Sequence, residues 1–178
     1  MDNSFYRIKS ISDKWYKTFH KIYSVSFPVH EQRNEQQQIS AFGKENYYLI
    51  IKTEGEKLLS FIAYWDFDDY VYIEHLAVNP QYRGANIGSN TLNSFAEIIG
   101  KTILLEIDPI IDDVSRKRLH FYEKLGYVLN PYEHSHPAYD INFKPHRLLV
   151  LSHGKGIDET QYLRFHKNLS EVVMNDRN

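Results

Sequence analysis

The sequence predicts one α/β domain in which helices cover a mixed sheet, and three observations predict it. The length of 178 residues suits a single domain of ordinary size. Patterns typical of strands and helices alternate along the chain, and such alternation favours a sheet covered by helices. Residues 102–107 form a nearly continuous apolar run, which has the composition of a buried parallel strand.

The chain opens with a strand and a helix. Residues 5–11 alternate between apolar and polar types, as in a half-buried strand. Ser12 or Asp13 can cap a following helix, in which aromatic residues recur at helical spacing between Trp15 and Tyr23. Phe27-Pro28 ends this helix, because the residue before a proline avoids the helical conformation.

The middle of the chain predicts a helix and then three strands. Residues 31–42 contain few apolar side chains, so we expect a second, largely exposed helix. Residues 47–52 and 58–67 are rich in β-branched and aromatic types and flank a turn that contains glycine, which indicates a hairpin. Residues 70–78 predict the third strand of this group.

The second half predicts three helices and three strands. Helices are expected over residues 89–99 and 112–125, each followed by a glycine that suits a helix end. The run at 102–107 separates them. Residues 127–129 begin another strand, and residues 147–151 form the last one. Residues 159–174 predict a terminal amphipathic helix.

Composition excludes several classes of protein. The formal net charge of −2 gives no basic field for wrapping nucleic acid. The absence of cysteine excludes disulfides, thiolate metal sites and a thiol nucleophile. No apolar run approaches the roughly 18 residues that span a bilayer, and residues 1–4 do not open a signal peptide. We therefore expect a cytoplasmic protein that binds neither nucleic acid nor membrane.

Residues 72–89 read as a strand, a tight loop and the start of a helix. A helix N-terminus presents unpaired N–H groups at the positive end of its dipole. Gly84 and Gly88 allow phosphate oxygens to approach the backbone, and Arg83 adds positive charge. The segment therefore predicts either a pyrophosphate site or simply a sharp turn. The motifs of P-loop, dinucleotide-binding and serine hydrolase proteins are absent from the sequence.

A second motif, Phe121-Tyr122-Glu123-Lys124-Leu125-Gly126-Tyr127, ends the helix predicted at 112–125. Alone it is typical of a buried helix face with a glycine cap. Taken with the loop, however, the sequence resembles the GNAT superfamily of N-acetyltransferases. Its first motif, Q/R-x-x-G-x-G/A, matches Gln81-Tyr82-Arg83-Gly84-Ala85-Asn86 except at Asn86. Its second, F/L-Y-E-K-L-G-F/Y, matches residues 121–127 throughout.

The resemblance covers residues 5–151 and is strongest over 70–130. It implies a GNAT-like fold, with a central, mostly antiparallel twisted sheet, one splayed parallel strand pair and helices on both faces. We therefore expect a GNAT-like domain over residues 1–151 and a C-terminal extension over 152–178. The helix of that extension would pack on the domain or on a partner subunit, in a monomer or a homodimer.

The resemblance also implies that acetyl-CoA binds between the parallel strands at 70–78 and 102–107, without a metal. The pantetheine arm would pair with the backbone of the first strand, and the pyrophosphate would lie on the amides of the loop. Asn86 tolerates the left-handed conformation, so the loop can survive the mismatch. Ser115 stands where many members have asparagine. The expected co-substrate residues are Leu76, Ala77, Val78, Gln81, Arg83, Gly84, Ala85, Asn86, Ile87, Gly88, Ser89, Ser115 and Phe121.

The implied reaction is direct attack of a primary amine on the thioester. The resemblance places Tyr122 beside the sulfur, as the acid that protonates the CoA thiolate. A base must also take the proton of the amine. Glu74 is the first candidate, with His75, Glu106 and water as alternatives; Glu74 and His75 are adjacent on a strand, so we expect their side chains to face opposite sides. Without cysteine, no cysteinyl acyl-enzyme can form, which favours a ternary complex.

The acceptor is expected to be a primary amine of a small molecule or a peptide. Glu31, Arg33, His136 and Tyr139 fall where family members line the acceptor site, but the sequence does not identify the acceptor. His134, His136 and Asp140 could supply metal ligands, although a polar loop is the favoured interpretation of this segment. The alternative function is a non-catalytic acyl-CoA-binding regulatory module of the same fold.

Overall fold

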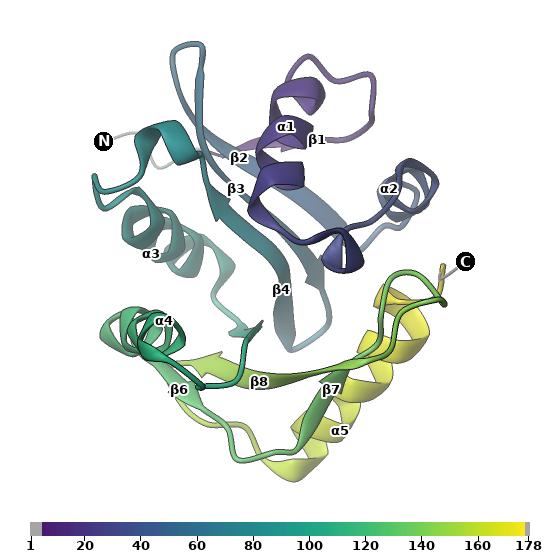
Figure 1. The fold of residues 1–178 in the computed structure, drawn as a ribbon, viewed down its shortest axis with the longest axis vertical. Helices are drawn as coiled ribbons and strands as arrows, with labels where there is room; N and C mark the ends of the chain where they lie inside the picture. The colour runs from purple at the N-terminus through teal and green to yellow at the C-terminus, as the bar shows by residue number, and fades with distance from the viewer. Residues whose placement is uncertain (1–4, 177–178) are drawn as a thin grey trace. The chain divides into compact units, whose positions relative to one another are not determined.

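A computed structural model describes residues 5–176. The chain forms two compact units, one that ends at Lys101 and one that begins at Thr102. Figure 1 shows the elements of both, and each unit is described by itself below.

The first unit contains four antiparallel strands that neighbour each other in chain order. They are β1 (Tyr6–Ile8), β2 (Tyr47–Glu54), β3 (Lys57–Asp66) and β4 (Tyr70–Val78). The hairpin and the third strand predicted from the sequence are confirmed. The first strand is shorter than the alternating pattern suggested.

Helices cover both faces of this sheet. Aromatic rings of α1 (Tyr16–Ser26) contact Phe61 on one face, at a closest centroid distance of 4.8 Å. On the other face, α3 (Ile87–Ile99) contacts Tyr64 through a phenylalanine, at 4.9 Å. Phe61 and Tyr64 differ by an odd number of positions on β3, so their side chains point to opposite faces. The core of the unit therefore lies in two layers around the sheet.

The helix predicted over 31–42 is present but begins later, as α2 (Glu35–Phe42). A separate 3-10 helix, η1 (Val29–Glu31), precedes it. Asn34 restarts the helix with a capping box, in which its side chain accepts from the N–H of Gln37 and its own N–H donates to the Gln37 side chain. Gln37 is buried, so the prediction of a largely exposed helix was wrong.

The second unit is built around β8 (His146–His153). Antiparallel to it lie β5 (Thr102–Ile107) along one edge and β6 (Tyr127–Leu129) along the other, while β7 (His134–His136) pairs with its first residues. The strand β7 corrects the prediction of a polar loop there. Both of its histidines are buried and the serine between them is exposed, which is the alternation of a strand.

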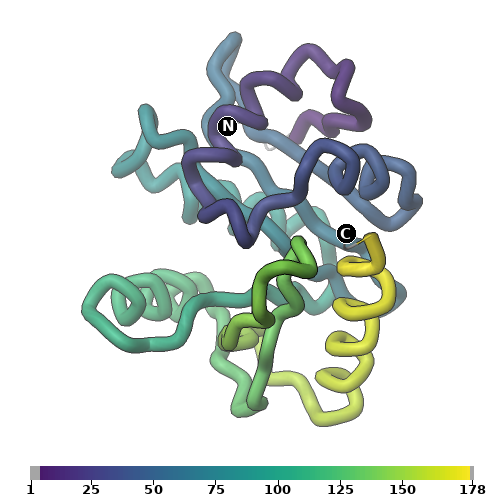
Figure 2. Tube along the Cα trace, turned by 45° about the vertical axis from the view of Figure 1, so that its right-hand side comes forward, coloured from purple at the N-terminus to yellow at the C-terminus, as the bar shows by residue number. Residues whose placement is uncertain are grey.

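Two helices complete the second unit. The helix α4 (Asp113–Lys124) contacts β6, and α5 (Glu159–Asn168) continues into a π-helical turn, η3 (Leu169–Val173). Tyr162 of α5 stacks on Tyr132 at 4.2 Å between ring centroids. The C-terminal helix therefore packs on the region around β7, beside which it runs in Figure 2.

Candidate active site

The loop between β4 and α3 adopts a left-handed turn. It begins with η2 (Pro80–Tyr82), a single turn in which Asn79 accepts a hydrogen bond from the N–H of Gln81. Gly84 has a φ of 91° and Asn86 a φ of 56°. Asn86 is the one residue other than glycine with positive φ among residues 5–176. The sequence argument that asparagine would tolerate this turn is confirmed.

The backbone N–H groups of this loop lack hydrogen-bond acceptors. From Arg83 to Ser89, no N–H group has an acceptor among the described residues, and the first bond of α3 runs from Asn90 N–H to Asn86 C=O. No side chain caps α3, and its first turn contains no acidic residue. Free N–H groups and the positive end of the helix dipole together favour an anion. The geometry of the loop is therefore suited to an anion, and the pyrophosphate site stays a prediction.

We expect Asn86→Val to destabilise the protein. A β-branched residue in the left-handed region is strained, and the penalty is about 1–2 kcal/mol. The measurement is the free energy of unfolding by urea. Asn86→Gly is the matched control, since glycine adopts this φ without strain. Its free energy of unfolding should lie within a few tenths of a kcal/mol of the parent's. Equal stability of the two variants would contradict the left-handed turn.

The strand β4 carries a bulge at Glu74. In its pairing with β3, Ala63 lies opposite His75, and the next residue, Tyr64, lies opposite Ile73. Glu74 is therefore the extra residue, and the alternation of side chains is interrupted at this point. Glu74 and His75 both turn toward the face covered by α1, so the expectation that they face opposite sides was wrong.

Contacts with one helical segment show this common orientation. The His75 ring lies 4.9 Å from the ring of Tyr23, edge to face. Arg33, whose N–H donates to the Tyr23 hydroxyl at 2.7 Å, forms a salt bridge with Glu74. Its Nε and Nη2 lie 3.0 and 2.7 Å from Glu74 Oε1, and Trp65 Nε1 donates to Oε2 at 2.8 Å. The side chains of Arg33 and Glu74 are 3% and 0% exposed.

These contacts make Glu74 a firmly held anion. A buried carboxylate that binds a guanidinium and an indole N–H gains little by taking a proton, because protonation would leave the guanidinium unpaired. The role of Glu74 as general base remains a prediction. The other residues that the sequence offered as the general base, His75 and Glu106, lie in the first and the second unit respectively.

The side chain of Ser115, predicted to contact the co-substrate, forms hydrogen bonds within the first turn of α4. Its hydroxyl accepts from the N–H groups of Ile111 and Asp112, at 3.0 and 3.1 Å. The carboxylate of Asp112 in turn accepts from the Ser115 N–H at 2.7 Å, which completes a capping box at the start of α4. The hydrogen bonds that Ser115 donates to this carboxylate, first from its N–H and then from its hydroxyl, lower the pKa of Asp112. Ser115 therefore shapes the first turn of α4.

Tyr122 and Phe121 lie together near the end of α4. Desolvation raises the pKa of Tyr122 to about 12, while the Arg118 guanidinium acts in the opposite direction. The phenol therefore stays protonated near neutral pH, as a proton donor must. The ring of Tyr127 lies 5.5 Å from that of Tyr122. The Tyr127 hydroxyl is buried and has no hydrogen-bond partner among the described residues.

Glu106 on β5 meets two histidines from β7. Its Oε1 is hydrogen-bonded to His134 Nε2, and its Oε2 lies 3.7 Å from His136 Nε2. The side chains of Glu106, His134 and His136 are 5%, 0% and 4% exposed. Sequence reasoning placed these histidines in a polar loop. The signal that could have grouped them is their spacing of two residues, the period of a strand.

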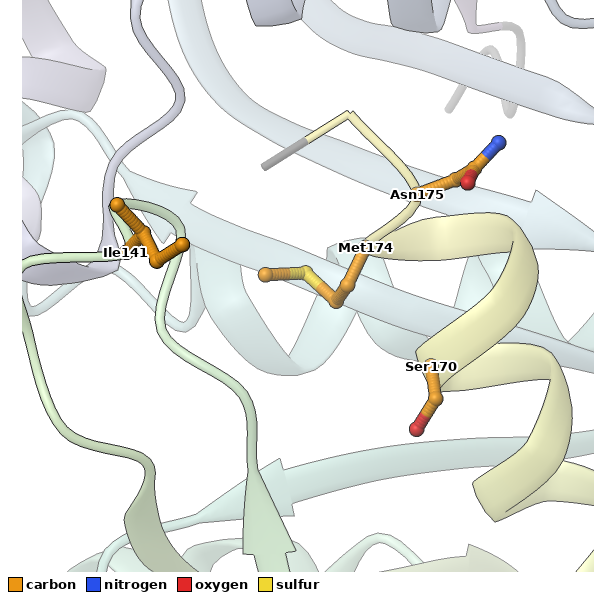
Figure 3. A pocket seen from close by; sticks show the side chains of 4 residues that line it. All are labelled: Ile141, Ser170, Met174 and Asn175. Carbon is orange, nitrogen blue, oxygen red and sulfur yellow. The ribbon is translucent and has the colours of Figure 1, made fainter. Parts of the chain in front are cut away.

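One pocket of the second unit has a volume of about 270 Å³. Its lining comes from Ile141 in the connection between β7 and β8 and from Ser170, Met174 and Asn175 at the C-terminal end. Figure 3 shows the Met174 side chain extending toward Ile141. Ligand pockets usually range from roughly 300 to 1,000 Å³, so this one suits a side chain rather than a whole CoA molecule.

Residues 5–176 contain neither a metal-binding cluster nor a membrane-spanning helix. No group of three or more His, Asp or Glu side chains there is arranged to hold a metal ion. The carboxylate of Asp140, grouped with His134 and His136 in the sequence, accepts instead from the amide groups of Asn142. No helix in the same range is long and apolar enough to cross a membrane.

The first sequence motif lies in the loop before α3 and the second at the end of α4, with β5 between the two helices along the chain. Comparison with known proteins points to the same family as these motifs. The profile of the Acetyltransferase (GNAT) family matches residues 12–127. The chain belongs to the GNAT acetyltransferase family. This confirms the resemblance inferred from the motifs at 81–86 and 121–127.

Individual relatives support the GNAT assignment. YjbC of Bacillus subtilis (strain 168), predicted to be an acetyltransferase, is 29% identical over 112 residues, which cover 62% of this chain and 54% of YjbC. The chain thus matches only about half the length of this curated relative. A solved structure from Bacteroides thetaiotaomicron, predicted to be a GNAT acetyltransferase, is 27% identical with a TM-score of 0.90 and covers 98% of this chain and 99% of its own. The predicted GNAT-like α/β fold is confirmed.

A more distant structural neighbour is Naa50 of Arabidopsis thaliana in complex with the bisubstrate analogue CoA-Ac-MVNAL. It is 24% identical, with a TM-score of 0.57, and the match covers 84% of this chain and 97% of Naa50. At this identity the likeness supports the fold alone.

Proposed function

We propose that this chain transfers the acetyl group of acetyl-CoA directly to a primary amine in a ternary complex. The observation that carries the proposal is the row of free amides from Arg83 to Ser89, held open by the left-handed turn at Asn86. Family membership supports acetyl-CoA as the molecule whose pyrophosphate these amides would bind. A cytoplasmic location, and a monomer or homodimer, remain predictions.

The pyrophosphate of acetyl-CoA would lie on these loop amides. The guanidinium of Arg83 would add charge, and the backbone of Leu76, Ala77 and Val78 at the end of β4 would pair with the pantetheine arm. Gln81, bound through its N–H to Asn79, holds the loop in register with β4. Phe121 would contact the co-substrate from α4, and Ser115 would act through the helix start that it caps.

The reaction needs a proton donor for the CoA thiolate that leaves. The lone pair of the amine forms a bond to the acetyl carbonyl carbon, the carbon–sulfur bond breaks, and the thiolate takes a proton. We assign that proton to Tyr122, whose raised pKa keeps the phenol protonated. The phenolate then regains a proton from solvent.

The amine must also lose a proton, and Glu106 is the better assignment for its acceptor. Both carboxylates have partners, but of different kinds. Glu74 binds the guanidinium of Arg33, which does not give up its proton, and the indole N–H of Trp65. Glu106 is bonded through Oε1 to His134, and its Oε2 lies 3.7 Å from His136 Nε2, so its neighbours are imidazoles, which exchange protons near neutral pH. A proton delivered between these atoms would be shared by both.

The acceptor belongs to the class of primary amines on small molecules or peptides. The analogue in the Naa50 complex joins CoA to a peptide, which makes peptides a sensible first panel. The pocket beside Ile141 and Met174 could take one side chain of such a peptide. The competing function is a regulatory module that binds acetyl-CoA without turnover.

The test is thiol release from acetyl-CoA with a panel of peptides, amino acids and small amines. Calorimetric titration with CoA is run in parallel. Amine-dependent thiol release supports the transferase. Binding of CoA with no release across the panel would favour the regulatory module, and absence of CoA binding would contradict both functions.

A further inference from the structure

Asn79 fastens the start of the loop between β4 and α3 to the strand β3. Its backbone N–H donates to the carbonyl of Leu59 at 2.8 Å, and its side-chain Nδ2 donates to the carbonyl of Leu58 at 2.9 Å. Its Oδ1 accepts from the N–H of Gln81 at 3.1 Å, and its carbonyl accepts from the N–H of Tyr82 at 2.9 Å. Asn79 is 9% exposed, so water competes little for these hydrogen bonds. One buried residue thus joins the start of the loop to two consecutive residues of β3.

A pair of buried hydroxyls fastens the other end of the loop. Thr91 on α3 and Ser60 on β3 are both 0% exposed, and their hydroxyl oxygens lie 2.7 Å apart. The Thr91 hydroxyl also donates to the carbonyl of Ile87, the first residue of α3, at 2.7 Å. Ser60 directly follows Leu59 along β3. The first turn of α3 is therefore joined to the same stretch of strand as Asn79.

The strand β3 is a firm support for both attachments. It pairs with β2 along one edge and with β4 along the other, and Ser60 lies opposite Lys52 and Val78. A strand held by hydrogen bonds along both edges cannot shift without breaking them. The consecutive residues 58–60 thus fix the two ends of the loop relative to each other.

Hydrogen bonding divides the loop into a held part and an open part. Pro80 has no N–H, and the N–H groups of Gln81 and Tyr82 both bind Asn79. The N–H groups of residues 83–89 lack acceptors among the described residues. Several donors must point at the oxygens of an anion together if they are to bind it. A loop that is ordered before its ligand arrives loses less conformational freedom on binding, and so binds more tightly.

We propose that Asn79 and the pair of Ser60 and Thr91 are positioning residues, which hold the free N–H groups of residues 83–89 in the arrangement that the pyrophosphate of CoA would bind. The proposal rests on the proposed function. All three side chains are buried and bonded within the first unit, so they act on the co-substrate through the loop. They lie outside the motif at residues 81–86.

Variants of the hydroxyl pair separate positioning from stability. Thr91→Val keeps the shape of the side chain and removes its hydroxyl, so the buried hydroxyl of Ser60 loses this partner and the protein is destabilised. Combining Thr91→Val with Ser60→Ala removes both hydroxyls, so most of the stability should return. The link between β3 and the first turn of α3 is absent from both variants, so a loss of CoA affinity should persist in both.

Ser94→Ala is the matched control for these variants. Ser94 is also buried on α3, and its hydroxyl accepts from Lys52 Nζ on β2 at 2.9 Å. The substitution removes a link between the same helix and the same sheet, one turn beyond Thr91. A general weakening of the contact between α3 and the sheet would therefore appear in this variant as well.

The first measurement is calorimetric titration of the full chain with CoA. In Asn79→Ala, in Thr91→Val and in the double variant, the Kd of CoA should rise by about tenfold, while in Ser94→Ala it should stay within about twofold of the parent's. Urea denaturation of the same proteins gives their stability. A double variant that regains CoA affinity along with its stability would overturn the positioning role. Unchanged affinity in Thr91→Val, or an equal loss in Ser94→Ala, would do the same.

The second measurement needs no ligand. Nitrogen-15 relaxation of the free, isotope-labelled chain gives an order parameter for each N–H group of the loop. Residues 83–89 should have values of about 0.85 in the parent, as in rigid backbone, and should fall below about 0.6 in Asn79→Ala. A loop that is flexible in the parent, or equally rigid in Asn79→Ala, would contradict the proposal. If the parent does not bind CoA, the proposed function fails, while the relaxation result still decides whether Asn79 holds the loop.

Discussion

Replacing Tyr122 with phenylalanine should lower kcat at saturating acetyl-CoA by roughly 100-fold. A positioned general acid contributes about 10²–10⁴ in rate, and without the phenol the CoA thiolate would leave unprotonated. The KM for acetyl-CoA should change little, since the ring remains. Because the pKa of Tyr122 is raised to about 12, its ionisation should not limit the rate between pH 6 and 9. Steady-state kinetics of thiol release measure both effects.

Tyr127→Phe is the matched control for this experiment. Its ring contacts that of Tyr122, and its buried hydroxyl has no hydrogen-bond partner among the described residues. Removing such a hydroxyl relieves a desolvation penalty of about 1–3 kcal/mol. This variant should keep kcat and unfold at a higher urea concentration. Unchanged kcat in Tyr122→Phe would remove the tyrosine from the mechanism, whatever the control shows.

The second large effect is expected at the buried pair of Arg33 and Glu74. Arg33→Met removes the cation and leaves the Glu74 carboxylate buried beside the indole N–H of Trp65. Breaking a buried ion pair at one end costs about 3–5 kcal/mol, because one charge stays uncompensated. We expect a loss of this size in the free energy of unfolding, measured by urea denaturation.

Two variants test this explanation. Arg33→Met combined with Glu74→Gln removes both charges and keeps an acceptor for Trp65, so most of the stability should return. Lys101→Met breaks a salt bridge to Asp66 whose side chains are 34% and 35% exposed, and should cost no more than about 1 kcal/mol. A double variant as unstable as Arg33→Met would show that packing, not charge, holds this segment.

Most elements could be predicted from the sequence, because their signals are local. The strand over Tyr70–Val78 and the apolar strand over Thr102–Ile107 have the predicted bounds. The helix predicted over residues 31–42 begins only at Glu35, because the capping box at Asn34 starts it there. The prediction failed at β7, whose two histidines are polar by type but buried against neighbours distant in the sequence.

The candidate site divides in the same way. The loop at Arg83–Ser89 was predictable, because glycine and asparagine placement controls backbone conformation within a few residues. The orientation of Glu74 was not, since a bulge is visible only in the register between β4 and β3. The grouping of Glu106 with His134 and Tyr162 required the pairing of β5 and β7 with β8 and the packing of α5.

The sequence by itself determined the family, the turn that Gly84 and Asn86 make before α3, and the absence of a thiol nucleophile. Each follows from residue types at short, fixed spacings. The tertiary structure alone decided which carboxylates are held by partners and by which ones. The salt bridge between Arg33 and Glu74 joins residues 41 positions apart, and the hydrogen bond between Glu106 and His134 joins residues 28 positions apart. Such contacts depend on strand register and helix packing, which no local pattern encodes.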